Sequence, residues 1–134
     1  MMNVKLFGAF IKKRRINSKI RIVDMADELG ISLSYYSDIE NGRRLPPNNP
    51  DTQKTLFSKL IAVLNLSDDE VEEMNNAVDH DLYSKGIISP DMASYATENK
   101  SARVLFRNIM NENLSEEQIQ ALNEKIKAIK EGKA

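Results

Sequence analysis

A short helix with a start signal and a stop signal lies within residues 30–44, GISLSYYSDIENGRR. Ser32 suits the position before the first turn, because its hydroxyl can accept a backbone N–H group that is left unpaired there. Asn41-Gly42 ends the helix, since glycine takes the left-handed conformation of a C-terminal cap without a steric penalty. Between these signals Tyr36 and Ile39 are three residues apart, so both face a core. The chain must therefore fold around a short helix that is apolar on one side.

The other side of this helix is polar. Ser34, Tyr35 and Asp38 fall on it, facing outward. Arg43 and Arg44 follow directly after the stop signal, and we expect neither to have an acidic partner. The pattern predicts a helix that presents small polar groups to the outside, with positive charge fixed at its far end.

A second helix precedes the first and completes a helix-turn-helix. Ile22, Met25, Ala26 and Leu29 have helical spacing over residues 21–29. Gly30 follows, where a tight turn between two helices needs a residue that tolerates positive φ. Ala26 is small, as the close crossing of the two helices requires.

In this stretch the chain resembles the phage-repressor/Cro-type (XRE) helix-turn-helix family. The match covers about residues 5–66, roughly half of the chain. Two positions depart from the family pattern: Ile22 stands where many members have a phosphate-binding Gln, and Lys19 where a Gly is usual. Lys19 or Arg21 would then supply the charge at that end. The residues that carry the resemblance are Asp24-Met25-Ala26, Leu29-Gly30-Ile31-Ser32, Ser34-Tyr35-Tyr36-Ser37-Asp38-Ile39-Glu40-Asn41-Gly42-Arg43-Arg44 and Pro46-Pro47.

The resemblance implies an all-α fold with a five-helix repressor-like DNA-binding domain, and the helix signals after residue 84 add a C-terminal helical extension. It also implies an ion pair between Arg15 and Glu40. The apolar periodicity agrees with the fold, because no run of residues shows the two-residue alternation of a strand. We expect the helix-turn-helix domain to occupy residues 1–83 and the extension residues 84–134.

Local signals place the other helices. A first helix over residues 3–15 is capped by Asn3, and a proline-containing loop over residues 41–51 precedes a fourth helix that begins at Asp51 or Thr52. Ser67 to Glu70 and Ser115 to Gln118 have the spacing of capping boxes, which predict two further helix starts. Ser89-Pro90 starts a short helix, and another covers about residues 100–112.

The composition excludes several kinds of chemistry. The chain has no cysteine and one histidine, His80, so disulfides, thiol catalysis and the usual zinc sites are ruled out. The five glycines are scattered and form no phosphate-binding loop. We therefore expect a non-enzyme without cofactor or metal. The absence of a long apolar run and of a signal-peptide pattern predicts a cytoplasmic protein with no membrane partner.

The net charge of −1 conceals an uneven distribution. Residues 1–50 contain nine Lys/Arg and five Asp/Glu, whereas residues 51–134 contain ten and fifteen. The half with the helix-turn-helix is therefore basic, with a net charge of +4, and the other half is acidic. This division suits one face for nucleic acid and one region for protein contacts.

In a helix-turn-helix the second helix enters the major groove of double-stranded DNA with its first residues toward the base edges. The expected phosphate-binding residues carry a positive charge or an amide N–H. The predicted base-reading residues are Ser32, Leu33, Ser34, Tyr35 and Asp38, and the predicted phosphate-binding residues are Lys19, Arg21, Asn41, Arg43 and Arg44.

Three functions remain open from the sequence. The first is a sequence-specific transcriptional regulator that acts as a dimeric repressor on an inverted repeat. The second is an antitoxin that represses its own operon and binds a toxin through the C-terminal segment. The third, a protein-interaction module that has lost DNA binding, is disfavoured by the cap signals and by Arg43-Arg44. The predicted contacts with a second copy or another protein are Leu105, Ile109, Ile119, Leu122, Ile126 and Ile129.

Overall fold

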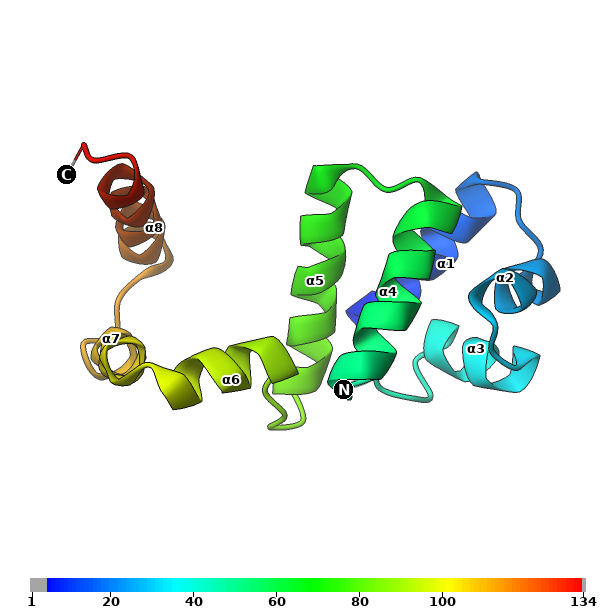
Figure 1. Ribbon diagram of the computed structural model, residues 1–134, viewed down its shortest axis with the longest axis horizontal. Coiled ribbons are helices and arrows are strands. Elements are labelled where there is room, and N and C mark those ends of the chain that lie inside the picture. Colours follow the sequence, from blue (N-terminus) through cyan, green and yellow to red (C-terminus); the bar gives the residue numbers. More distant parts are fainter. Residues whose placement is uncertain (1–4, 134) are drawn as a thin grey trace. The chain divides into compact units, whose positions relative to one another are not determined.

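The computed structural model describes residues 5–133, and helices joined by turns and loops are the only regular secondary structure over that range (Figure 1). This confirms the all-α prediction. The helices are α1 (Leu6–Asn17), α2 (Ile22–Leu29), α3 (Leu33–Glu40), α4 (Pro50–Leu64), α5 (Asp68–Tyr83), α6 (Pro90–Glu98), α7 (Lys100–Asn111) and α8 (Glu116–Lys130). No helix within residues 5–133 is long and apolar enough to cross a membrane.

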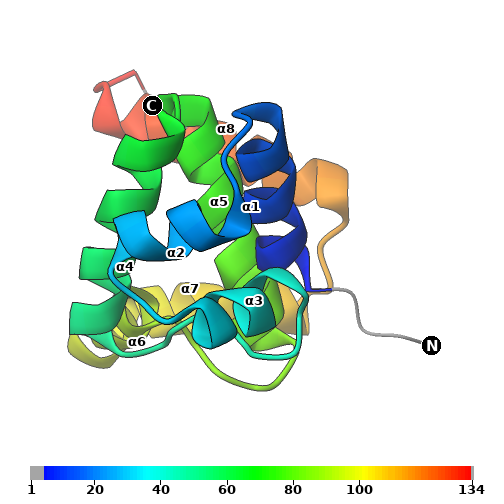
Figure 2. The same cartoon turned by 90° about the vertical axis from the view of Figure 1, so that its right-hand side faces the viewer.

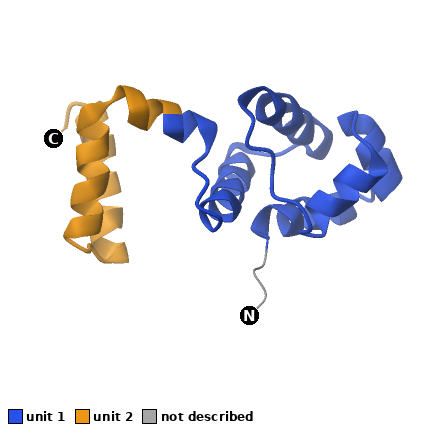
Figure 3. Cartoon of the chain, turned by 90° about the horizontal axis from the view of Figure 1, so that it is seen from below, with its two compact units in different colours: residues 1–93 blue, residues 94–134 orange. Residues whose placement is uncertain are grey.

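The chain divides into two compact units, residues 1–93 and 94–134 (Figure 3). We call them unit 1 and unit 2. The division comes ten residues later than the predicted domain boundary, because the segment after α5 packs on unit 1. Ser89 is buried and its hydroxyl donates to the carboxylate of Asp79, while Ile87 lies against the hydrophobic core.

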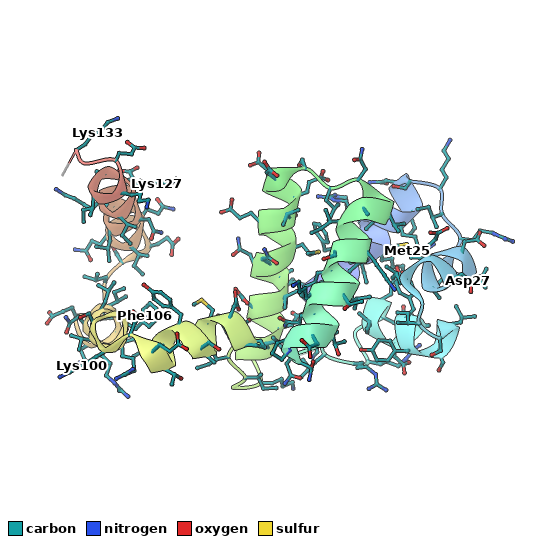
Figure 4. The ribbon with its side chains drawn as sticks, in the orientation of Figure 1. Met25, Asp27, Lys100, Phe106, Lys127 and Lys133 are labelled. Atoms are coloured by element: carbon teal, nitrogen blue, oxygen red, sulfur yellow. The ribbon has the colours of Figure 1, made fainter. Side chains whose placement is uncertain are left out.

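The core of unit 1 is built from the inward faces of α1 to α5. α1 packs against α3 and α5, and α2 packs against α3 and α4, as seen from the side of α2 and α3 in Figure 2. Met25 points inward from α2 and is fully buried, whereas Asp27 points away from the core (Figure 4). The apolar core consists of Phe7, Phe10, Ile11, Met25, Ala26, Leu29, Tyr36, Ile39, Leu56, Leu60, Leu64, Met74, Ala77, Val78 and Leu82.

Local capping signals were good guides to the helix starts. Both predicted capping boxes are present, at the start of α5 and at the start of α8. The start of α4 differs from the prediction by one or two residues. Asn49 accepts the backbone N–H groups of Asp51 and Thr52, so Pro50 occupies the first helical position, where its missing N–H costs nothing.

The start of α1 is held by a residue from a distant helix. Asp81 on α5 is 1% exposed, and its two carboxylate oxygens accept the backbone N–H groups of Leu6 and Phe7, each at 2.9 Å. A carboxylate at the positive end of a helix is favourable, and here it also satisfies buried donors. The predicted cap, Asn3, lies outside the described residues.

Unit 2 contains most of α6 together with α7 and α8. No residue of these three helices is buried, although α7 and α8 each carry apolar side chains along one side. Val104 is 49% exposed, Met110 63% and Ile129 65%. Unit 2 therefore has no closed hydrophobic core of its own.

Candidate DNA-binding surface

The turn between α2 and α3 has the geometry of a helix-turn-helix. Gly30 has φ +70°, as predicted, and the N–H of Ile31 donates to the carbonyl of Ala26 at 3.1 Å. The ammonium group of Lys59 on α4 donates to the carbonyl of Leu29 at 3.3 Å. The end of α2 is therefore capped by its own turn and by a cation, which is favourable at the negative end of a helix.

Both predicted ends of α3 are confirmed. The hydroxyl of Ser32 accepts the backbone N–H of Tyr35 at 3.0 Å. At the other end Gly42 has φ +75°, and the N–H groups of Arg43 and Arg44 both point to the carbonyl of Asp38, at 2.8 and 3.2 Å. This reversal of the chain brings the two arginines back over the last turn of α3.

The five predicted base-reading residues all lie at the start or on the outward side of α3. Ser32 and Ser34 are exposed, and Leu33 keeps 46% of its surface exposed. Tyr35 and Asp38 are half-buried, and Tyr35 also packs against the hydrophobic core. The first turn of α3 is thus the most accessible part of this surface.

The two arginines after α3 do have partners, so the expectation that they would lack an acidic partner is wrong for Arg43. Its Nε lies 3.0 Å from Oδ1 of Asp38, with 62% of the Arg43 side chain still exposed. The guanidinium of Arg44 lies over the ring of Tyr35, 5.0 Å from the centroid, a cation–π contact. The sequence places Asp38 and Arg43 five residues apart, and only the glycine turn makes them neighbours.

The other predicted phosphate-binding residues are exposed as well. The amide of Asn41 donates to the carbonyl and the hydroxyl of Ser37, at 2.9 and 3.2 Å. Arg21 pairs with Asp24 at 2.7 Å, and this hydrogen bond lowers the pKa of the aspartate. Lys19 has φ +59°, which explains why a glycine suits this position in the family.

The predicted ion pair between Arg15 and Glu40 is confirmed, and it fastens the end of α3 to α1. Two guanidinium nitrogens of Arg15 donate to the carboxylate of Glu40, at 2.7 and 3.0 Å, and a third donates to the carbonyl of Ile20 at 2.8 Å. The hydrogen bond to Glu40 raises the pKa of Arg15. Beside the pair, burial raises the pKa of the Tyr36 phenol far above its usual range, and the Glu40 carboxylate adds to the shift.

A groove of about 570 Å³ runs along the start of α3, and no pattern in the sequence predicts it. One wall is formed by the turn before α3 and by Tyr35; the other wall is α4, with Thr52, Thr55 and Lys59. The alternation of polar and apolar residues on α4 shows which side faces outward, but it does not reveal what lies opposite.

The predicted contact residues of the C-terminal segment lie on α7 and α8, and none is buried. Leu105, Ile126 and Ile129 are exposed by 38%, 48% and 65%. Ile109, Ile119 and Leu122 are half-buried. They belong to unit 2, whereas all the predicted DNA-contacting residues belong to unit 1.

Comparisons with known proteins agree with this geometry. A family model described as a helix-turn-helix domain matches residues 6–74, from α1 into α5. The chain is 42% identical over 66 residues to the "ImmF control region 10 kDa protein" of Bacillus phage phi105. The aligned region covers 49% of this chain and 67% of the phage protein. No solved structure shows a significant match. The matched region includes the whole turn between α2 and α3 and its supporting helices, so the chain belongs to the helix-turn-helix family of phage-repressor (XRE) type and is a DNA-binding regulator.

Proposed function

We propose that the protein is a transcriptional repressor that binds an inverted repeat of double-stranded DNA as a dimer. The observation that carries this proposal is the surface of α3: an exposed first turn followed by two arginines at the far end. In this arrangement α3 enters the major groove, in the manner general to helix-turn-helix proteins. Because its target is operator DNA, the protein acts in the cytoplasm.

The side chains of α3 suggest how sequence is read. The hydroxyls of Ser32 and Ser34 discriminate weakly, since a hydroxyl can both donate and accept. Leu33 suits contact with a thymine methyl group, and Asp38 suits the amino group of a cytosine. Tyr35 reaches a base or a phosphate.

The positive residues around α3 are assigned to the phosphates. Arg43 and Arg44 at its end, with Asn41, fix the register without reading sequence, and Lys19 and Arg21 act in the same way at the start of α2. Arg43 is paired with Asp38 in this structure. A phosphate that attracts Arg43 therefore also leaves the Asp38 carboxylate available to a base.

Removing Arg43 or Asp38 should affect DNA binding in different ways. Arg43→Ala should weaken binding to all sequences by a similar factor and reduce the slope of log K against log salt by about 1, because one phosphate contact is lost. Asp38→Ala should instead relax the preference at one base pair, worth about 1–3 kcal/mol. Selection of bound sequences from a random DNA pool, followed by titrations at several salt concentrations, measures both effects.

Lys13→Ala is the matched control, since it also removes one positive charge, but from a second groove, lined by α1 and α5. It should leave both the affinity and the selected motif nearly unchanged. An unchanged motif for Asp38→Ala would remove Asp38 from the base-reading residues. Failure of the wild-type protein to select any sequence would favour the interaction module that has lost DNA binding.

The dimer part of the proposal rests on unit 2. A single recognition helix buries little surface, so proteins of this kind commonly place two copies on half-sites about 10 base pairs apart. Unit 2 has the exposed apolar side chains that a second copy would cover. Unit 1, in contrast, has a closed core within its own helices.

Truncation after Ala93 separates the roles of the two units. The shortened protein should still fold with helices α1 to α5 intact, because the hydrophobic core lies entirely in unit 1. It should be monomeric in sedimentation experiments, and its affinity for the selected inverted repeat should fall by about 100-fold or more as the second half-site contact is lost. A truncated protein that is still a dimer at micromolar concentration would place the interface in unit 1.

An antitoxin is the second candidate, favoured because the exposed apolar side chains of α7 and α8 belong to unit 2, whereas the DNA-binding surface belongs to unit 1. In this alternative, unit 2 binds a toxin and unit 1 represses the operon. An adjacent gene for a small toxin, together with a stable complex on co-expression, would support it. A full-length protein that is dimeric by itself, and that forms no complex with the products of adjacent genes, would favour the simple repressor.

A further inference from the structure

The chemistry of α8 points to a particular dimer, and this inference rests on the dimeric repressor proposed above. We propose that two copies of the chain pair through antiparallel α8 helices. The contact is the α8 stripe, which we define as Ile119, Leu122, Ile126 and Ile129. No residue of α8 is buried, and the last two stripe residues are the most exposed of the four.

The spacing of the α8 stripe is symmetric. Its residues are separated by three, four and three positions, which is the spacing of the core positions in a coiled coil. This spacing reads the same in both directions along the helix. An antiparallel partner therefore places Ile119 opposite Ile129 and Leu122 opposite Ile126, so that each stripe residue faces another aliphatic side chain.

The charges beside the stripe favour the same orientation. Glu116, Asn123 and Lys130 recur every seven residues, so they lie along one flank of the stripe. In an antiparallel pair Glu116 lies next to Lys130 of the partner copy at both ends, and the two Asn123 amides meet in the middle. Neither Glu116 nor Lys130 forms an ion pair within residues 5–133, so both charges are available.

The parallel arrangement is less favourable on the same grounds. On the opposite flank lie Gln118 and Lys125. In a parallel pair Lys125 lies beside Lys130 of the partner copy on both sides, and no Glu–Lys contact compensates. In the antiparallel pair only one such repulsion occurs, between the two copies of Lys125, against two Glu–Lys attractions.

A second copy is therefore the occupant that the α8 surface fits best. The stripe and its Glu116/Lys130 flank complement themselves under a two-fold rotation, which is the symmetry of most homodimers. An unrelated protein would have to carry the same symmetric pattern of apolar and charged residues to complement this surface equally well.

Charge reversal on full-length protein tests the orientation. Glu116→Lys should weaken dimerisation by about tenfold or more at low salt, because two attractions become two repulsions, and Lys130→Glu should do the same. Combining both substitutions in one chain should restore the wild-type affinity to within a few-fold. Lys125→Gln should strengthen the dimer. Glu124→Lys is the control, since Glu124 lies on the far side of α8 from the stripe.

Sedimentation over a range of concentrations gives the dimerisation constant, and circular dichroism checks that each variant is folded. No change with Glu116→Lys, or no recovery in the combined variant, would overturn the antiparallel pairing. A monomeric wild-type protein would overturn the self-association itself. DNA selection is measured separately, so a monomer that still selects an operator would refute this dimer and leave the DNA-binding proposal standing.

Discussion

Gly8→Ala is expected to reduce the free energy of unfolding by about 3 kcal/mol, the upper part of the range for overpacked cores. A β-carbon at this position of α1 would lie 2.4 Å from the carbonyl oxygen of Ile39 and 2.6 Å from that of Glu40. Both atoms are backbone atoms at the end of α3, which α1 contacts directly. They cannot rotate away as a side chain would, so one helix must move away from the other.

The expected change in the free energy of unfolding has the opposite sign to that of an ordinary glycine-to-alanine exchange in a helix. In a helix interior, glycine is about 1 kcal/mol less favourable than alanine, so this exchange would ordinarily stabilise α1. Gly86→Ala is the control, because Gly86 has φ +76° but no atom within 4 Å of the added carbon. It should cost only the left-handed strain, about 1–2 kcal/mol. Urea unfolding monitored by circular dichroism compares the two, and equal costs would mean that α1 and α3 are not this close.

The sequence was sufficient for those parts of the fold that depend on neighbouring residues. Ser32, Gly30 and Gly42 predicted the ends of α2 and α3 correctly, because a cap depends on residues within one turn of it. The outward side of α3 followed from helical periodicity in the same way, except that Tyr35 also packs against the hydrophobic core. The family resemblance added the Arg15–Glu40 pair, which spacing alone would not have indicated.

What the sequence did not provide depends on contacts between distant segments. In the sequence Gly8 is one of several scattered glycines, and nothing there indicates that the backbone of α3 lies close to it. Asp81 stood in an acidic helix, with nothing to connect it to the start of α1. Arg43 was expected to lack an acidic partner because the course of the chain after Gly42, which returns it to Asp38, was unknown. Each of these features needs the tertiary structure.

Breaking the ion pair between Arg15 and Glu40 should have an effect as large as that of Gly8→Ala. Arg15→Met is expected to destabilise unit 1 by about 3–5 kcal/mol, because it leaves a carboxylate whose side chain is 2% exposed without its partner. The carbonyl of Ile20 also loses a donor. Since the pair joins the end of α3 to α1, DNA binding should fall together with stability.

Arg14→Met provides the matched control on the neighbouring residue. Arg14 pairs with Glu70 and Glu73, whose side chains are 34% and 62% exposed, so its loss should cost about 1 kcal/mol or less. Chemical unfolding of both variants under the same conditions gives the comparison. Equal and small effects would show that Glu40 is better solvated than its burial indicates.

The double variant Arg15→Met/Glu40→Leu separates the two parts of this cost. A buried pair that is replaced by apolar residues of similar size is often neutral for stability, so the double variant should recover most of the loss seen with Arg15→Met alone. The recovery measures the penalty of the unpaired carboxylate, and the remainder measures the lost bond to Ile20, about 1 kcal/mol. If the double variant were as unstable as Arg15→Met, the carboxylate penalty would be small, and the main contribution of Arg15 would be its contacts outside the ion pair.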